Sequence, residues 1–281
     1  MRRTCSWVVV VLLAIVGASV RAQTDSQALQ RMVATERAFA AATAEVGVRD
    51  GFLAFFADDA VRVVGSPEAA VVPARAGLEA QALPKLPIAN QLIWEPFTGQ
   101  VSSDGSLGWL TGGYVQLNQA QRDVVAQGAY FSVWKRQANG TWRVWLDEGI
   151  NLPQVWQGAA PFRVAPDPDT GAAGTSSETI DQAEASIAAS RDAWLARLSK
   201  DVRLHINARM PIVGREAVTA APPAEMRYRV LRTEAAASGD LAVTIGSFDM
   251  VRGGGPTHGT WVRVWKRDLT AHWRIVFQTE K

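Results

Sequence analysis

The sequence contains almost no cysteine and little histidine. Its single cysteine, Cys5, lies ahead of an apolar run near the start of the chain, and only three histidines are present. Disulfides, cysteine nucleophiles and thiolate metal sites are therefore excluded from residue 23 onward. His205, His258 and His272 lie far apart, without H-x-H or H-x3-H spacing. We therefore expect no metal site and no cofactor.

The sequence also lacks an apolar run long enough to cross a membrane. The run from Trp7 to Val16 is ten residues long, too short for a hydrocarbon layer of about 30 Å. It follows the basic start Met1-Arg2-Arg3 and precedes Val20 and Ala22, which fit the small-residue pattern of a signal peptidase site. Residues 1–22 are therefore predicted to be a signal peptide cleaved after Ala22. We expect a periplasmic or secreted protein with no membrane contact after cleavage.

An excess of charge of either sign is missing too. The formal net charge is +2, and without the three arginines of the predicted signal peptide the chain has 26 basic and 27 acidic residues. This balance argues against a nucleic-acid partner. With 48% hydrophobic and 20% charged residues, the composition is globular and excludes a coiled coil or a collagen-like chain. A length of 281 residues suggests about two domains.

An internal repeat runs through the chain. Val133-Trp134-Lys135-Arg136 and Val264-Trp265-Lys266-Arg267 lie 131 residues apart, and each is followed after five residues by Trp-Arg. Three more matches precede them in the same order, at offsets that grow to 142: Leu107-x4-Gly112-x-Tyr114 with Leu241-x4-Gly246-x-Phe248, Gly77-x-Glu79-Ala80 with Gly214-x-Glu216-Ala217, and Phe52-Leu53 with Trp194-Leu195. The chain is therefore predicted to be a tandem duplication.

Each copy has helical patterns first and strand patterns afterwards, which predicts an α+β fold with helices on one face of a sheet. We expect the first domain at 23–152, a Pro/Gly/Ser-rich linker at 153–177, and the second domain at 178–281. A helix restarting at a Ser177 cap should run through Leu198. In the first copy, the predicted helices are 29–46 and 52–56, the predicted strands are 61–64, 91–101, 107–117, 124–136 and 141–147, and Asn139-Gly140 is a hairpin turn.

These features together are similar to a known superfamily. The phrase Phe55-Phe56-Ala57-Asp58-Asp59-Ala60-Val61, the Gly-x-Glu-Ala element and the closing Val-Trp-Lys-Arg-x5-Trp-Arg strands resemble the SnoaL-like and ketosteroid-isomerase-like branch of the nuclear transport factor 2-like superfamily. The resemblance covers residues 26–152 and, more weakly, 178–281. It implies two cone-shaped domains, each a strongly curved antiparallel sheet wrapped around N-terminal helices, with an apolar pocket in the concave side.

The resemblance does not imply one activity, because such domains include isomerases, cyclases, dehydratases, hydrolases and binding modules. In the first copy the isomerase base would fall near Val64, which cannot take a proton, and the oxyanion donor would fall at Tyr130. Aligning Val202 with Val61 places His205 at the base position of the second copy and Trp261 at the donor position. His205 is therefore the candidate catalytic residue. It also fits a half-buried strand histidine, and a shift of one residue would turn it to the other face.

Several aromatic residues are candidates to line the pockets. Trp134, Trp142, Trp265 and Trp273 recur between the copies and are expected to build the two cores. The expected ligand-binding residues are Trp94, Trp109, Tyr114, Tyr130, Trp145 and Asp147 in the first copy and Trp261 in the second, with Asp147 included if it shares the face of Trp145.

Three functions remain open from the sequence. The first is a module that binds a small hydrophobic molecule in one or both cones. The second is a metal-free isomerase, lyase or hydrolase that uses acid–base chemistry in one copy, through His205 with Tyr228 or Tyr130. The third is an interaction protein whose filled cones pair through their convex sheet faces, within one chain or as a homodimer. An open apolar pocket favours the first, a titratable pocket histidine the second, and a filled pocket the third.

Overall fold

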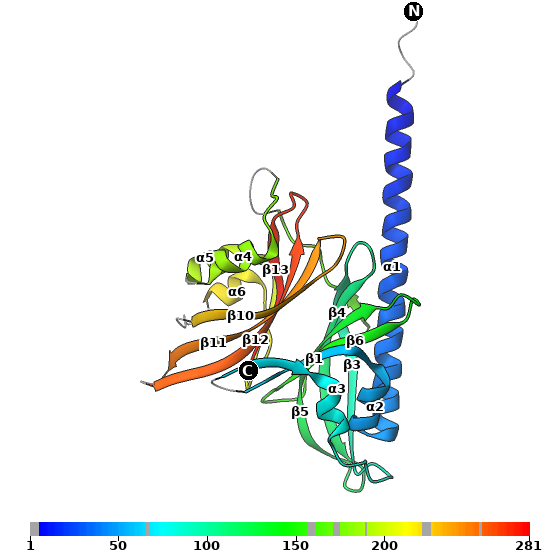
Figure 1. Cartoon of the computed structure of the whole chain (residues 1–281), viewed down its shortest axis with the longest axis vertical. Coiled ribbons are helices and arrows are strands. Elements are labelled where there is room, and N and C mark those ends of the chain that lie inside the picture. Colours follow the sequence, from blue (N-terminus) through cyan, green and yellow to red (C-terminus); the bar gives the residue numbers. More distant parts are fainter. Residues whose placement is uncertain are drawn as a thin grey trace, which may run out of the picture.

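The computed structural model describes residues 6–65, 68–156, 161–170, 175–188, 190–220, 226–252 and 255–281. Residues 1–5 of the predicted signal peptide and residues 157–160 and 171–174 of the predicted linker lie outside these ranges. The described chain forms two α+β units, each with helices against a curled sheet (Figure 1), and neither sheet closes into a barrel. The predicted fold class is therefore confirmed.

The order of elements in both units is helices first and a meander of long strands afterwards. The first unit contains α1 (Ser6–Val46), α2 (Val48–Phe55), β1 (Phe56–Val64), β2 (Ala70–Pro73), α3 (Ala74–Glu79), β3 (Asn90–Val101), β4 (Leu107–Asn118), β5 (Asp123–Arg136), β6 (Trp142–Asn151) and β7 (Arg163–Val164). The second contains α4 (Ile180–Ile187), α5 (Arg191–Arg197), β8 (Leu198–Ile206), β9 (Ile212–Val213), α6 (Arg215–Ala220), β10 (Met226–Ala235), β11 (Leu241–Arg252), β12 (Gly255–Arg267) and β13 (Trp273–Glu280).

The two sheets share one topology. The strand order is β2-β1-β6-β5-β4-β3-β7 in the first and β10-β11-β12-β13-β8-β9 in the second. The long strands pair antiparallel, whereas β1 runs parallel to β6, and β8 runs parallel to β13. The sheets are therefore mixed, because the strand that follows the helices returns alongside the last strand of the meander.

Helix α1 covers the concave side of the first sheet and packs mainly on β3. Its buried residues recur at helical spacing: Ala28, Leu29, Met32, Val33, Glu36 and Phe39. This stripe faces the sheet, as an amphipathic helix requires. Towards its N-terminus, α1 projects beyond both units (Figure 1). Among the described residues, no helix combines the length and apolar character that a membrane crossing needs.

The alanine-rich stretch at the start of the second unit forms two helices where the sequence predicted one from Ser177 to Leu198. Thr179, not Ser177, caps α4: its hydroxyl accepts from the Gln182 amide, and the Gln182 side chain accepts from the Thr179 amide. This reciprocal capping box satisfies two amides at once. Ser190 then accepts from the Ala193 amide and begins α5, so a second cap interrupts the stretch.

The predicted linker carries a short strand. Arg163 and Val164 form β7, which pairs parallel with Thr98 and Gly99 at the edge of β3. The prolines and glycines around it indicated a flexible segment. These two residues instead extend the first sheet, because the edge of β3 offers unpaired backbone groups.

The two units pack against each other through the convex faces of their sheets. One buried apolar cluster contains residues of both: Val61, Leu107, Trp109, Phe131, Val133, Trp145, Leu146 and Ala165 with Ala236, Leu241, Val243, Ile245, Val262, Val264, Val276 and Phe277. At its centre the rings of Phe131 and Phe277 stack at 4.5 Å between centroids. Burial of this many apolar side chains stabilises the pair of units.

Reciprocal polar contacts surround this cluster. In the two matching hairpins, Asp104 accepts from the Ser238 amide at 3.1 Å, and Asp240 accepts from the Ser103 amide at 3.1 Å. Lys135 pairs with Glu234 of the other unit at 3.0 Å. Such exchange of equivalent contacts is the pattern of a two-fold interface, formed here within one chain.

Candidate functional site

The strand ladders fix how the two copies correspond. The parallel pairs are Phe56 with Val144 and Val61 with Leu146 in the first unit, and Leu198 with Ile275 and Arg203 with Phe277 in the second. Val144 and Leu146 lie 131 residues before Ile275 and Phe277, the offset of the Trp-Arg motif. Val61 therefore corresponds to Arg203, one residue further along than Val202, the position the sequence alignment assigned.

This shift moves His205 away from the base position. His205 corresponds to Val63, and Val64 corresponds to Ile206, so an apolar residue stands at that position in both units. Side chains alternate between the faces of a strand. Accordingly, Val202 and Leu204 pack in the core of the second unit, whereas His205 faces away from it.

His205 is buried among rings on the side of the first unit. Its ring lies 4.8 Å from that of Phe277 and 5.5 Å from that of Trp156, between centroids. Its Nε2 atom has no hydrogen-bond partner among the described residues. Burial, together with the charge of Arg203, lowers the pKa of His205 to about 3, so the imidazole is neutral at physiological pH. The structure thus places it outside the concave interior.

The expected ligand-binding residues divide between the two faces of the first sheet. Trp109 and Trp145 lie in the cluster between the units, whereas Trp94, Tyr114 and Tyr130 pack in the concave interior. Asp147 pairs with Ser132 and also faces the interior. A β-bulge at Trp145 separates its face from that of Asp147, which period-two alternation did not predict.

Aromatic rings around α1 fill most of the first concave interior. The Phe39 ring lies 4.8 Å from both Phe52 and Trp94, between centroids. Beside it the Glu36 carboxylate accepts from Trp94 Nε1 at 2.6 Å, Ser132 Oγ at 2.7 Å and Trp134 Nε1 at 2.8 Å. Burial raises the pKa of Glu36 against these three hydrogen bonds. This part of the cone is a satisfied core.

Several polar groups near this core have no partner among the described residues, and Tyr130 and Asp147 are two of them. The Tyr130 hydroxyl is shielded from solvent and makes no hydrogen bond to the described residues. Burial and then the charge of Glu36 raise the pKa of Tyr130 well above its usual range. The described residues give Asp147, which stays partly exposed, no hydrogen bond or ion pair. Burial, then the carboxylates of Glu36 and Glu148, hold its pKa well above the usual range.

Two glycines lie next to these groups. Tyr130 pairs across the ladder with Gly149, which is exposed. A Cβ atom at Gly149 would meet only the Tyr114 ring, at 3.6 Å. Tyr114 lies flat over Gly128, where a Cβ would be 2.3 Å from its ring. We call Tyr114, Gly128, Tyr130, Asp147 and Gly149 the Asp147 site.

The second unit fills the equivalent positions with bonded side chains. At the places of Tyr130, Asp147 and Gly149 stand Trp261, Gln278 and Glu280. Gln278 accepts from Arg263 Nε at 2.6 Å and donates to Glu280. Arg263 Nη1 donates to Glu184 at 2.6 Å. This interior is therefore closed by its own polar network, apart from Arg263 Nη2, which has no partner among the described residues.

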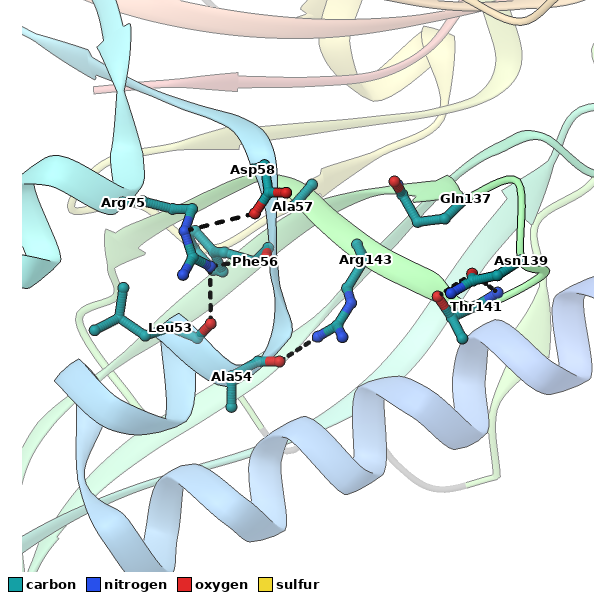
Figure 2. Close-up of a pocket in the computed structure, with 10 residues that line it drawn as sticks. All are labelled: Leu53, Ala54, Phe56, Ala57, Asp58, Arg75, Gln137, Asn139, Thr141 and Arg143. Carbon is teal, nitrogen blue, oxygen red and sulfur yellow. Dashed lines mark hydrogen bonds and ion pairs between the residues drawn. The ribbon is translucent and has the colours of Figure 1, made fainter.

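A separate open cavity of about 350 Å³ lies at the base of the first unit (Figure 2). It is lined by Leu53, Ala54, Phe56, Ala57, Asp58, Arg75, Gln137, Asn139, Thr141 and Arg143. We call it the Arg143 cavity. Arg75 donates to the carbonyls of Leu53 and Phe56 at 2.9 and 3.1 Å, and Arg143 donates to the carbonyl of Ala54. Its walls are polar, unlike the apolar pocket that the sequence predicted.

Within the described part of the chain, no group of three or more His, Cys, Asp or Glu side chains comes together. The buried Glu36 and Glu184 were not anticipated. Glu36 does carry a signal, because an acid stands within the apolar stripe of an amphipathic helix, between Val33 and Phe39. Such an acid must bond inside the core.

Comparisons with known proteins give matches among solved structures only. No protein-family model matches the chain, and no curated protein matches its sequence. Solved structures do match, each over about a third of this chain. A ketosteroid isomerase-like protein from Erwinia carotovora atroseptica is 16% identical, with a TM-score of 0.30, and the match covers 36% of this chain and 92% of the other.

Two nuclear transport factor 2-like proteins of unknown function match in the same way. The protein from Shewanella oneidensis is 15% identical, with a TM-score of 0.27 and coverage of 32% of this chain and 80% of the other. The protein from Pseudomonas putida is 14% identical, with a TM-score of 0.29 and coverage of 36% and 80%.

Proposed function

We propose that the first unit binds a small, uncharged and largely apolar molecule at the Asp147 site, and that the second unit supports it. One observation carries this proposal: Asp147 is a partly exposed acid with a raised pKa and no partner among the described residues. In its protonated form, which a raised pKa favours, a carboxyl group donates a hydrogen bond. A ligand carbonyl or hydroxyl oxygen over Gly149 would accept it, and a small shift of the Tyr130 ring would bring a second donor.

The contrast between the units supports this assignment. Gln278 and Glu280 occupy the matching space in the second unit and bond to each other. The first unit has a carboxyl without a partner and a glycine there. The Tyr130 hydroxyl is buried without a partner among the described residues, which is costly, so an external molecule that pairs with this hydroxyl gains free energy. The surrounding rings of Trp94 and Tyr114 suit an apolar body.

The test is binding to the mature chain. Native mass spectrometry, followed by denaturing extraction, would identify a bound small molecule. Thermal shift with progesterone, carvone and palmitate would then compare two neutral ketones with an anion. We expect stabilisation by a ketone and none by palmitate. An empty chain that none of the three stabilises would overturn the proposal.

A blocking variant locates the site. Gly149→Leu places a side chain over Asp147, where the nearest atom to a new Cβ is the Tyr114 ring, and it should abolish the ketone shift. Gly255→Leu is the matched control, because a Cβ there meets nothing within 4 Å in the second unit. Loss of the shift in both variants, or in neither, would contradict binding at the Asp147 site.

Acid–base turnover of the bound molecule is a second candidate function. Burial first raises the pKa of Asp147, and enzymes raise the pKa of carboxyl groups in this direction when they use them as general acids or bases. Asp147→Asn separates the two functions, because the amide still donates a hydrogen bond but transfers no proton. Ligand consumption by the parent chain that is absent from the Asp147→Asn variant, with binding retained, would establish an enzyme.

We also propose that the chain is exported and loses residues 1–22. The packing of α1 is compatible with this, because the buried stripe from Ala28 to Phe39 lies after Ala22 in the sequence. Cleavage after Ala22 would leave that stripe intact.

A further inference from the structure

The two units differ at the base of their sheets, where each has an arginine in the same place. Arg143 and Arg274 lie 131 residues apart and make the same contact: each donates through Nη1 to the carbonyl of the matching residue near the end of a helix, Ala54 or Ala196. The arginines therefore have the same backbone setting. Cations at a helix C-terminus also interact favourably with its dipole.

The neighbouring hairpins match as well. Gln137 accepts from the Gly140 amide at 2.8 Å, and its counterpart Asp268 accepts from the Ala271 amide at 2.9 Å, in each case through the backbone carbonyl. Gly140 and Ala271 both have positive φ, 83° and 61°. The two loops therefore have the same backbone hydrogen bond, and residues 137 and 268 occupy equivalent positions relative to Arg143 and Arg274.

The side chains at these positions differ in charge. Asp268 Oδ2 accepts from Arg274 Nε at 3.2 Å, and this ion pair is buried. Gln137 is neutral, and Arg143 forms no ion pair with any described residue. The second unit closes its base with a carboxylate, and the first leaves a cavity of about 350 Å³ at Arg143 (Figure 2).

We propose that the Arg143 cavity binds a small carboxylate, whose oxygens take the place that Asp268 fills beside Arg274. The donors are the guanidinium nitrogens of Arg143 that do not contact Ala54, and a second N–H of the Gln137 amide, whose Nε2 also donates to the Lys135 carbonyl at 3.3 Å. Charge-assisted hydrogen bonds of this type are strong and geometrically specific. Arg75 also lines the cavity, but its Nη1 donates to the carbonyls of Leu53 and Phe56, and Asp58 and Glu79 both lie 3.9 Å from its Nε. This site is separate from the Asp147 site and does not depend on it.

The contact in the second unit also indicates that the ligand of the Arg143 cavity is a carboxylate and not another anion. The group that contacts Arg274 in the second unit is the carboxylate of Asp268. Because the backbone around Arg143 is equivalent, the first unit should accept a planar anion of that size. The probe is succinate, titrated calorimetrically at constant ionic strength. Dimethyl succinate supplies the same carbon skeleton without charge, and inorganic phosphate supplies a tetrahedral anion.

Gln137→Asp is the decisive variant, because it supplies from within the chain the carboxylate that the second unit has. We expect succinate affinity to fall about tenfold or more, as the loss of a charged hydrogen bond predicts, while thermal stability rises. Arg143→Gln should have the same effect on affinity. Arg136→Gln is the control, since it removes an exposed arginine of β5 that does not line the cavity, and it should bind as the parent does.

Three results would overturn the proposal. They are no succinate binding to the parent chain, succinate affinity unchanged in Gln137→Asp, or phosphate or the diester binding as tightly as succinate. Because Gln137→Asp keeps Arg143 and its helix contact, the test remains decisive even if Arg143→Gln does not fold.

Discussion

Removing one ring between the two units should destabilise the whole chain. Phe277 is completely buried and belongs to the cluster shared by both sheets. Its ring stacks on Phe131 at 4.5 Å and 10°, and lies 5.3 Å from Trp109, between centroids. In Phe277→Ala these contacts are lost and a cavity remains. We expect the free energy of unfolding to fall by about 3–5 kcal/mol.

The size of this effect can be divided experimentally. The stacked pair itself should supply about 0.5–1.5 kcal/mol, measured as the coupling energy between Phe277→Ala and Phe131→Ala in a double-mutant cycle. For a chain of this size, each kcal/mol moves the melting temperature by about 2–4 °C. Phe277→Ala should therefore melt at least about 6 °C below the parent.

Urea unfolding monitored by tryptophan fluorescence, together with calorimetry, would measure both quantities. The control is Leu269→Ala, because that side chain is 94% exposed and its loss should change stability by less than about 0.5 kcal/mol. The parent should unfold in one transition, since both units share the cluster. Two separate transitions, or a cost below about 1 kcal/mol for Phe277→Ala, would refute an interface that stabilises both units.

Three other outcomes follow from the structure. Burial raises the pKa of Asp147 above its ordinary 3.8, so the parent loses free energy of unfolding as the pH rises from 3.8 through the pKa of the folded state. Asp147→Asn does not titrate, and its free energy of unfolding relative to the parent should therefore increase between about pH 4 and pH 8 in urea titrations. The same difference between variant and parent at both pH values would contradict this. Glu36→Ala removes the acceptor of three buried donors, of which Trp134 Nε1 keeps Ser132 Oγ at 3.0 Å, and the two left without an acceptor should cost about 2 kcal/mol or more in the same assay. Glu184→Ala leaves the buried Arg263 charge without its carboxylate and should cost about 3–5 kcal/mol. A cost below about 1 kcal/mol would count against either network. Mass spectrometry of the exported protein should find Gln23 as the first residue, and an intact N-terminus would exclude cleavage there.

The sequence predicted much of the fold because its signals are local or recurrent. The repeat identified two units of one kind, and the order of helical and alternating patterns gave α+β architecture. The Asn139-Gly140 hairpin formed where predicted, with Gly140 at φ 83°, since a tight turn depends on few residues. Each of these signals is either a property of neighbouring residues or a recurrence along the chain.

The candidate site was only partly accessible to such reasoning. Tyr130 and Asp147 were among the expected ligand-binding residues, and both face the first concave interior. Their lack of partners became visible only from the packing of α1 across the sheet. Trp109 and Trp145 carried the same aromatic signal but lie between the units, because composition does not indicate on which face a side chain falls.

The sequence by itself determined that this chain repeats one domain type and which segments form strands. Only the tertiary structure decided which face of its sheet each strand side chain occupies. The bulge at Trp145 and the one-residue shift that turns His205 outward reverse side-chain directions without changing any strand assignment. Contacts between distant residues decided the rest: Asp268 closes on Arg274 while Gln137 leaves Arg143 open. Strand side chains alternate between the two faces of a sheet at every residue. A single inserted residue therefore moves the side chains that follow it from the core face to the interface face, and this change is visible only in the pairing of the strands.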